Sequence, residues 1–232
     1  MNNSINIPEL RFKEYTVEWR SCLFGEIAES ISSGKSTQRN DEGKFPLYGS
    51  TGVIGHSDCF DYSGEKILIA RVGANAGSLY KVKGEYSVTD NTLILNLKIG
   101  FNVDFIHLLL IKTNLNKLVF GSGQPLVTSG HLKKIVSMIP SFEEQTKIAS
   151  FLTAVDEKLQ AFKKKKSLLE NYKKGVMQKL FSQELRFKDE NGNPFPDWEE
   201  KKLGEILYEV NEKTTKSNQY RILSSTAKGL YN

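Results

Sequence analysis

The chain has 232 residues, of which 39% are hydrophobic and 10% aromatic, so it can build one or two domains with ordinary cores. Its formal net charge of +5 is compatible with a nucleic-acid partner but does not establish one. The longest apolar run, residues 105–111 interrupted by His107, is far too short to span a membrane, and residues 1–4 lack a signal-peptide pattern. We therefore expect a cytoplasmic protein with no membrane partner.

Residues 9–140 have the pattern of a β-rich domain with some helix. Residues 23–32 could form a short helix or a strand, and residues 33–41 are a polar loop. Short β-type runs then alternate with turns that contain Gly, Asp or Asn, which is typical of short strands joined by tight turns. These runs are residues 45–48, 66–72, 78–82 and 92–97. Apolar residues at helical spacing predict a buried helix over 103–115, and residues 132–140 close the domain with a strand-like run.

Residues 143–181 are predicted to form one long helix. The segment contains no Pro and a single Gly, and Ser141 precedes Glu144 by three residues, as in a capping box. Apolar positions recur in alternating steps of four and three residues, which is the pattern of a coiled-coil seam. The seam comprises Ile148, Leu152, Val155, Leu159, Phe162, Leu169, Val176 and Leu180, with Lys166 and Lys173 at two further seam positions. At 1.5 Å per residue the helix would be about 58 Å long.

An apolar stripe along a helix of this length requires a partner helix. The alternative is that the helix packs back onto its own domain. Residues 163–166 are four consecutive lysines inside the helix, and at most two of them share a face. We therefore interpret this run as a solvated surface rather than as a nucleic-acid patch.

The beginning of the chain is repeated near its end. The sequence Glu-Leu-Arg-Phe-Lys at residues 9–13 recurs at residues 184–188, an offset of 175 positions. Trp19 recurs as Trp198, at an offset of 179 positions. A period this long exceeds any solenoid unit and indicates a duplicated domain. Residues 182–232 are therefore predicted to be the truncated start of a second copy.

The chain carries no recognisable catalytic constellation. Residues 33–37 (SGKST) resemble the end of a phosphate-binding loop, but the motif needs Gly at position 29, which is Glu29. The three histidines and two cysteines lack the spacing of metal ligands or of a catalytic pair. We therefore predict a non-catalytic protein with no metal site and with reduced, structural thiols. A degenerate methyltransferase or nuclease is a disfavoured alternative.

Several segments share the pattern of one known family. Trp19 is followed by L-F-G-E-I at residues 23–27, and F-P-L-Y-G-S-T-G-V-I-G occupies residues 45–55. The other matching segments are residues 67–77, 121–125, 139–152 with Asp156, and 174–181. Together they resemble the specificity subunit of type I restriction-modification enzymes, and the helix pattern is the most specific part.

This resemblance implies an α+β fold, in which a β-rich target recognition domain precedes a long coiled-coil-forming α-helix. The recognition domain would be residues 1–142, the helix residues 143–181, and the start of a second recognition domain residues 182–232. Each recognition domain would bind double-stranded DNA and read one half of a split site, and two such helices would pair antiparallel as a spacer. The chain itself would carry no cofactor. In this phage-defence system, partner modification subunits would use S-adenosylmethionine to methylate adenine, and partner restriction subunits, the motor-nucleases, would use ATP and Mg.

The chain is about half the usual length of such subunits, which is a departure from the family. It is expected to be either a truncated product or a half-subunit that forms a homodimer through its helix. Such a pair would read a palindromic split site, because protein symmetry maps onto half-site symmetry. A coiled-coil adaptor or scaffold that reads no DNA sequence is the alternative.

Base readout needs hydrogen-bonding side chains on loops, and phosphate contacts need Lys, Arg, Ser, Thr or backbone N–H groups. Four loops of the recognition domain qualify. The candidate DNA-binding residues on them are Lys35, Thr37, Arg39, Ser50, Thr51, Arg71, Asn75, Ser78, Ser122 and Gln124. Asn75 could pair with adenine, whereas Arg71 could instead be a structural ion-pair partner. An ordinary turn or a solvated charge is the alternative at each position.

Overall fold

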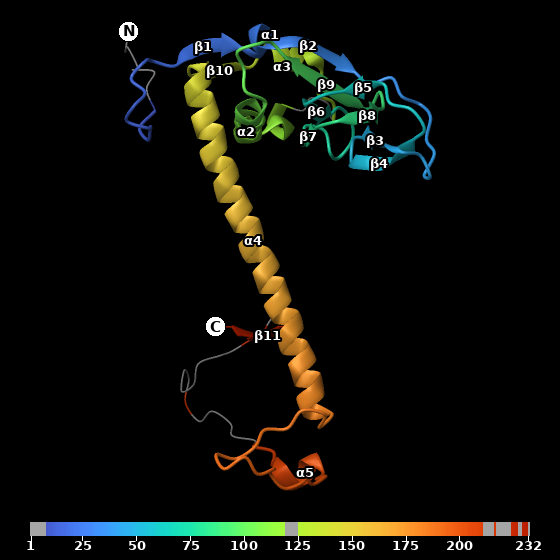
Figure 1. Cartoon of the computed structure of the whole chain (residues 1–232), viewed down its shortest axis with the longest axis vertical. Coiled ribbons are helices and arrows are strands. Elements are labelled where there is room, and N and C mark those ends of the chain that lie inside the picture. Colours follow the sequence, from blue (N-terminus) through green and yellow to red (C-terminus); the bar gives the residue numbers. More distant parts are fainter. Residues whose placement is uncertain (1–7, 119–124, 211–215, 217–223, 227–228, 232) are drawn as a thin grey trace. The chain divides into compact units, whose positions relative to one another are not determined.

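The computed structural model describes residues 8–118, 125–210, 216, 224–226 and 229–231. The chain divides into two compact units, Met1–Lys166 and Ser167–Asn232. Figure 1 labels the elements along the chain, and each unit is described by itself. The predicted α+β fold, with β-sheets followed by a long helix, is confirmed. The boundaries of the three predicted segments stay a prediction.

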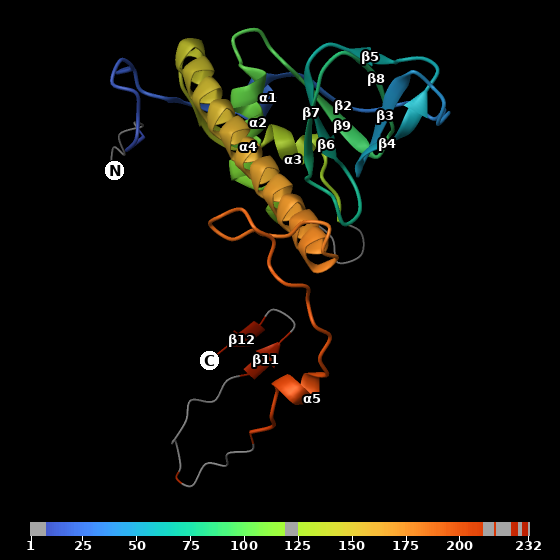
Figure 2. The same ribbon diagram turned by 60° about the horizontal axis from the view of Figure 1, so that its bottom comes forward.

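A four-stranded antiparallel sheet lies at the centre of the first unit (Figure 2). Its strand order is β2 (Ala28–Ser33), β9 (Thr92–Leu97), β6 (Lys66–Ala70) and β7 (Leu79–Val82). Strand β6 is buried along Ile67, Leu68, Ile69 and Ala70, so both faces of the sheet are covered. Because successive side chains point to opposite faces, Ile67 and Ile69 join one hydrophobic cluster and Leu68 joins another.

Short helices and the start of a long one cover one face of this sheet. They are α1 (Phe24–Ile27), α2 (Val103–Thr113), α3 (Ser129–Lys133) and α4 (Phe142–Phe181), with a 3₁₀ turn at Leu115–Leu118. The larger hydrophobic cluster fills the space between them and the sheet and includes Phe24, Ile27, Ile106, Leu110 and Leu132. A two-stranded antiparallel sheet, β1 (Arg20–Leu23) with β10 (Val136–Ile139), joins the beginning of the domain to its end.

A second four-stranded sheet covers the other face. Its order is β4 (Gly52–Ser57), β3 (Phe45–Gly49), β8 (Glu85–Val88) and β5 (Tyr62–Ser63), and β3 pairs with β8 in parallel. The smaller hydrophobic cluster lies between the sheets, around Leu68, Val88 and Tyr86. Tyr86 is 1% exposed, stacks on the ring of Tyr62 and meets the ring of Tyr48 edge to face. This burial raises the pKa of its hydroxyl to about 12.

The strands at 45–48, 66–72, 78–82 and 92–97 and the helix over 103–115 are confirmed, with ends shifted by a few residues. The prediction for residues 132–140 is partly wrong, because Leu132 lies in α3 and the strand begins at Val136. Residues 23–32 contain both a helix and a strand, because α1 ends where β2 begins. Residues 220–223 are a further short β-type run in the sequence and lie outside the described residues.

Helix α4 is a single unbroken helix of 40 residues, as predicted, and begins one residue earlier than expected. At 1.5 Å per residue it is about 60 Å long. The hydroxyl of Ser141 accepts a hydrogen bond from Glu144 N at 3.3 Å, which confirms Ser141 as the N-cap, whereas the Glu144 carboxylate accepts from Arg11 and Trp19 instead of completing a capping box. Only Glu144, Gln145 and Ala149 are buried along its length, so nearly all of the helix is exposed in the single chain.

The second unit repeats one local feature of the first. The Gly-Glu-Ile sequence at 25–27 lies in α1, and its repeat at 204–206 lies in a helix of the same length, α5 (Leu203–Ile206). The described residues also contain two short antiparallel strands, β11 (Ser224–Thr226) and β12 (Gly229–Tyr231). The same short sequence therefore takes the same conformation in both copies.

Candidate nucleic-acid interface

Arg71 lies where several segments of the first unit meet. Its backbone N–H donates to the Asn91 carbonyl at 2.9 Å, and its carbonyl accepts from Val127 N at 2.9 Å. Its half-buried guanidinium donates from Nη1 to the Ser33 hydroxyl at 3.3 Å. These bonds connect the start of the 71–78 loop to Ser33, at the start of the 33–41 loop, to Asn91 just before β9, and to Val127. Arg71 thus positions other loops, and its side chain is held by a hydroxyl rather than by the carboxylate that the alternative ion-pair interpretation requires.

The loop from residue 71 to 78 is a tightly closed turn. Ala70 N donates to the Ser78 carbonyl and Gly77 N donates back to the Ala70 carbonyl, both at 2.8 Å. Gly77 has φ of +90°, and a Cβ added there would lie 2.4 Å from Asn116 Oδ1 and 2.8 Å from its backbone N. Only glycine fits this position. The turn holds Ser78 half-buried and leaves Asn75 exposed at its tip.

The loop that carries Lys35, Thr37 and Arg39 runs along the second sheet. Its start is fixed to β8, because Ser36 N donates to the Val88 carbonyl at 2.9 Å and Val88 N donates to Ser36 Oγ at 3.0 Å. Exposed Lys35 and Thr37 line a polar cavity of about 230 Å³. The other lining residues are Ser36, Gln38, Ser57, Cys59 and Asp61.

Arg39 does not line this cavity. Its Nε lies 2.9 Å from Asp41 Oδ1, and this hydrogen bond lowers the pKa of the Asp41 carboxyl below its ordinary value. The side chains of both residues are more than half exposed, so the pair is weak and can open toward another anion.

Ser50 and Thr51 form the turn between β3 and β4. The Tyr80 hydroxyl on β7 donates to the Ser50 carbonyl at 3.0 Å, which ties this turn to the central sheet. Ser50 is half-buried and Thr51 is exposed. Ser122 and Gln124 lie outside the described residues. The next residue, Pro125, accepts a hydrogen bond from Gly73 N at 3.1 Å, so the chain beyond them runs along the 71–78 loop.

The structure therefore connects the loops at 33–41, 71–78 and 125–127 through Arg71, and holds the turn at 50–51 separately through β7. Hydroxyl, amide and cationic groups on these loops have the chemistry that phosphate oxygens and base edges require. Contact between these residues and DNA stays a prediction.

The predicted coiled-coil seam forms an exposed apolar stripe on α4. The most exposed of its residues are Val155 (48%), Leu159 (47%), Phe162 (58%) and Leu169 (56%), with Leu152 at 37%. Ile148, Val176 and Leu180 are half-buried. Within each unit, these side chains resemble half of a helix–helix interface more than a solvated helix surface.

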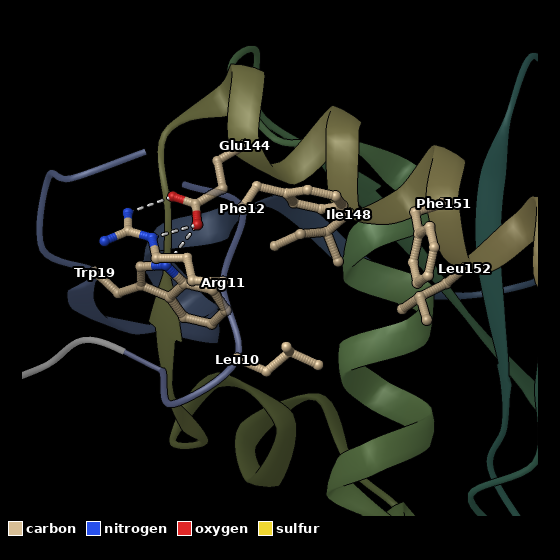
Figure 3. A pocket seen from close by; sticks show the side chains of 8 residues that line it. All are labelled: Leu10, Arg11, Phe12, Trp19, Glu144, Ile148, Phe151 and Leu152. Carbon is tan, nitrogen blue, oxygen red and sulfur yellow. Dashed lines mark hydrogen bonds and ion pairs between the residues drawn. The ribbon is translucent and has the colours of Figure 1, made fainter. Parts of the chain in front are cut away.

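A polar cluster at the base of α4 was missed by the sequence analysis (Figure 3). Arg11 donates from Nε and Nη2 to the two carboxylate oxygens of Glu144, at 2.7 and 2.6 Å, and Trp19 Nε1 donates to Oε1 at 3.2 Å. An apolar cavity of about 300 Å³ lies beside this cluster and is lined by Leu10, Phe12, Ile148, Phe151 and Leu152. A signal was present in the sequence, because Arg11 and Trp19 both recur in the repeat as Arg186 and Trp198.

Among the described residues, no helix combines the length and the apolar composition that a membrane span needs. Within the same residues, no three or more His, Cys, Asp and Glu side chains gather in a way that could hold a metal ion.

Comparison with known proteins gives consistent matches. Residues 16–171 match the type I restriction modification DNA specificity domain. The specificity subunit of the Escherichia coli type I restriction enzyme EcoprrI is 31% identical over 153 residues, which is 63% of this chain and 38% of that protein. The specificity subunit of the Methanocaldococcus jannaschii enzyme MjaVIII is 32% identical over 148 residues, which is 61% of this chain and 35% of that protein.

Solved structures agree on the fold. The type I restriction-modification S subunit from M. genitalium aligns with a TM-score of 0.59 and 19% identity, over 79% of this chain and 50% of that one. The HsdS subunit from Thermoanaerobacter tengcongensis aligns with a TM-score of 0.52 and 18% identity, over 75% of this chain and 47% of that one. The chain thus spans about half the length of these relatives or less. The match over 16–171 includes both the sheets and most of α4, and the chain therefore belongs to the family of type I restriction-modification specificity subunits.

Proposed function

We propose that this chain reads one half of a bipartite DNA site for a type I restriction-modification complex. The observation that carries the proposal is the family match over residues 16–171, which covers the candidate DNA-binding loops and the exposed helix together. The chain contributes sequence recognition and no catalysis. Modification subunits that bind S-adenosylmethionine carry out methyl transfer, and restriction subunits that use ATP and Mg carry out translocation and cleavage.

The loops around Arg71 read the half-site. Asn75 has a side-chain amide that can donate to and accept from adenine in the major groove, and it lies exposed on a turn with little freedom to move. Lys35 and Thr37 supply contacts to the phosphate backbone beside it. A rigid turn reads bases well because little conformational entropy is lost on binding.

The exposed stripe on α4 pairs with the same stripe on a second copy. The seam lysines favour an antiparallel arrangement. A parallel pair in register would place Lys166 of one helix opposite Lys166 of the other, so that like charges meet. In an antiparallel pair whose a positions face d positions, Lys166 lies opposite Phe162 and Lys173 lies opposite Val155. In that register Leu159 of one copy faces Leu169 of the other. The two recognition domains then lie at opposite ends of a two-helix spacer, and the pair reads a palindromic split site.

Methylation mapping tests this proposal. The chain is co-expressed with the modification subunit encoded beside it, and methylated adenines are located by long-read sequencing. A palindromic split motif supports half-site reading by a homodimer. A split motif with unlike halves contradicts the homodimer but keeps the recognition function. Absence of methylation in a soluble, co-purified complex contradicts half-site reading and favours a coiled-coil scaffold.

A further inference from the structure

We propose that Glu144 and Arg11 lock the direction in which α4 leaves the recognition domain, and thereby set how many base pairs separate the two half-sites. The inference rests on the proposed function, because the gap between half-sites has a meaning only if two recognition domains read one DNA. Both residues are positioning residues and need not touch DNA.

The contact between Arg11 and Glu144 is buried and directional. The Glu144 side chain is 1% exposed and that of Arg11 is 9% exposed, and the two side chains meet through two parallel hydrogen bonds. Arg11 Nη2 also donates to the Val17 carbonyl at 2.5 Å, and Trp19 donates to the same carboxylate. A bidentate pair fixes an orientation as well as a distance. Figure 3 shows Arg11 and Trp19 converging on Glu144 from one side of the helix.

The next residue ties the helix to other elements. Gln145 is 1% exposed, and its Oε1 accepts from Asn102 N, at the cap of α2, at 2.9 Å. Its Nε2 donates to the Pro140 carbonyl, directly after β10, at 3.1 Å. Two consecutive side chains therefore connect the first turn of α4 to the N-terminal segment, to α2 and to the end of β10.

Apolar contacts alone would attach the helix without fixing its angle. Ala149 is buried in the larger hydrophobic cluster and Ile148 packs against it, so the helix base stays attached when the polar pair is removed. Apolar burial is non-directional, and the cavity beside this base leaves room for small rotations. The angle of α4 then depends mainly on the polar contacts.

The length of α4 amplifies any change of angle. A helix of 40 residues is about 60 Å long, so a tilt of about 3° at its base moves its far end by about 3 Å. The rise of DNA is about 3.4 Å per base pair. A change of only a few degrees in the angle at the base of α4 therefore corresponds to about one base pair in the gap between the half-sites.

The test compares Glu144→Gln and Arg11→Lys with a matched control, Glu143→Gln, which changes the exposed neighbouring carboxylate. Each variant replaces the full chain in co-expression with the modification subunit, and the gap length of every methylated site is counted. We expect one gap length for the unchanged chain and for Glu143→Gln. For Glu144→Gln and Arg11→Lys we expect the same half-site sequences, with methylation spread to gaps one base pair longer or shorter.

Two results would overturn the inference while leaving the proposed function intact. One is an unchanged single gap in both variants, even at reduced overall methylation, because a merely structural role lowers the amount of active protein without changing the gap. The other is loss of all methylation in both variants while Glu143→Gln remains active, because the pair then acts on folding. Failure of the proposed function looks different, since the unchanged chain would then give no split motif.

Discussion

Shortening the Leu159 side chain should weaken the proposed homodimer by an amount that follows from its burial. Leu159 is 47% exposed in the single chain, so pairing can bury about half of its side chain. Full burial of a leucine is worth about 1.5–3 kcal/mol, so about 1 kcal/mol is gained per copy. A two-fold pair contains the site twice, so Leu159→Ala should cost about 2 kcal/mol. At 1.4 kcal/mol per factor of ten, the dimer dissociation constant should rise about 30-fold.

Sedimentation equilibrium over a series of protein concentrations measures this constant. Gln160→Ala is the matched control, because Gln160 is exposed on the same turn but lies off the seam. Circular dichroism checks that helix content is equal in both variants at concentrations where each is dimeric. Equal dissociation constants for Leu159→Ala and Gln160→Ala would refute pairing through this stripe. A strictly monomeric unchanged chain at micromolar concentration would refute the homodimer altogether.

Three further predictions concern the recognition domain. Asn75→Ala should lower specific DNA affinity by about 1–3 kcal/mol with unchanged thermal stability; equal competition binding at fixed salt would remove Asn75 from the readout set. Gly84→Ala should lower the free energy of unfolding by about 1–2 kcal/mol, because Gly84 has a φ of +97° but no atom would contact the added Cβ. Gly77→Ala should lower it by more in denaturant unfolding, because the added Cβ would also collide with Asn116. Equal losses for the two variants would contradict the close contact at Gly77. Burial lowers the pKa of His107 below its ordinary value of 6.5, so the unfolded chain binds more protons than the folded chain at acidic pH. The folded state should therefore lose stability as the pH falls below about 6.5. His107→Gln should reduce this loss, which unfolding experiments at two pH values would measure.

The long helix could be predicted from the sequence almost to the residue because its signals are local. Alternating steps of four and three residues, the absence of Pro and the Ser141 cap all lie within the segment itself. Strands β6 and β9 were also predictable, because each is a contiguous apolar run bounded by polar turns.

Strands β4, β5 and β8 could not be predicted in the same way. Strand β4 contains Gly and His, which are poor strand signals, whereas β5 and β8 owe their conformation to partners distant in sequence, as in the parallel pairing of Leu47 with Ser87. The register shift between Leu47 and Tyr48 further disturbs the alternation that a sequence pattern needs.

In the candidate site as well, features that depend on neighbouring residues could be predicted, and features that depend on residues distant in sequence could not. Loop positions were predictable, because Gly and polar residues mark turns, and Asn75 and Thr51 are indeed exposed. The role of Arg71 as a junction between loops depends on backbone bonds to Asn91 and Val127, which no local pattern reveals. The pair of Arg11 and Glu144 joins residues 133 positions apart, so only the repeat could have drawn attention to it.

The central sheet keeps two hydrophobic clusters apart, one packed with the helices and the start of α4, the other beneath the second sheet. Mutations at well-separated sites usually have additive effects on stability. A lineage can therefore accumulate changes around Tyr86 and its loops without having to re-optimise the base of α4. Under the proposed function, this architecture would allow DNA sequence preference to diverge in evolution while the base of the spacer helix is inherited unchanged.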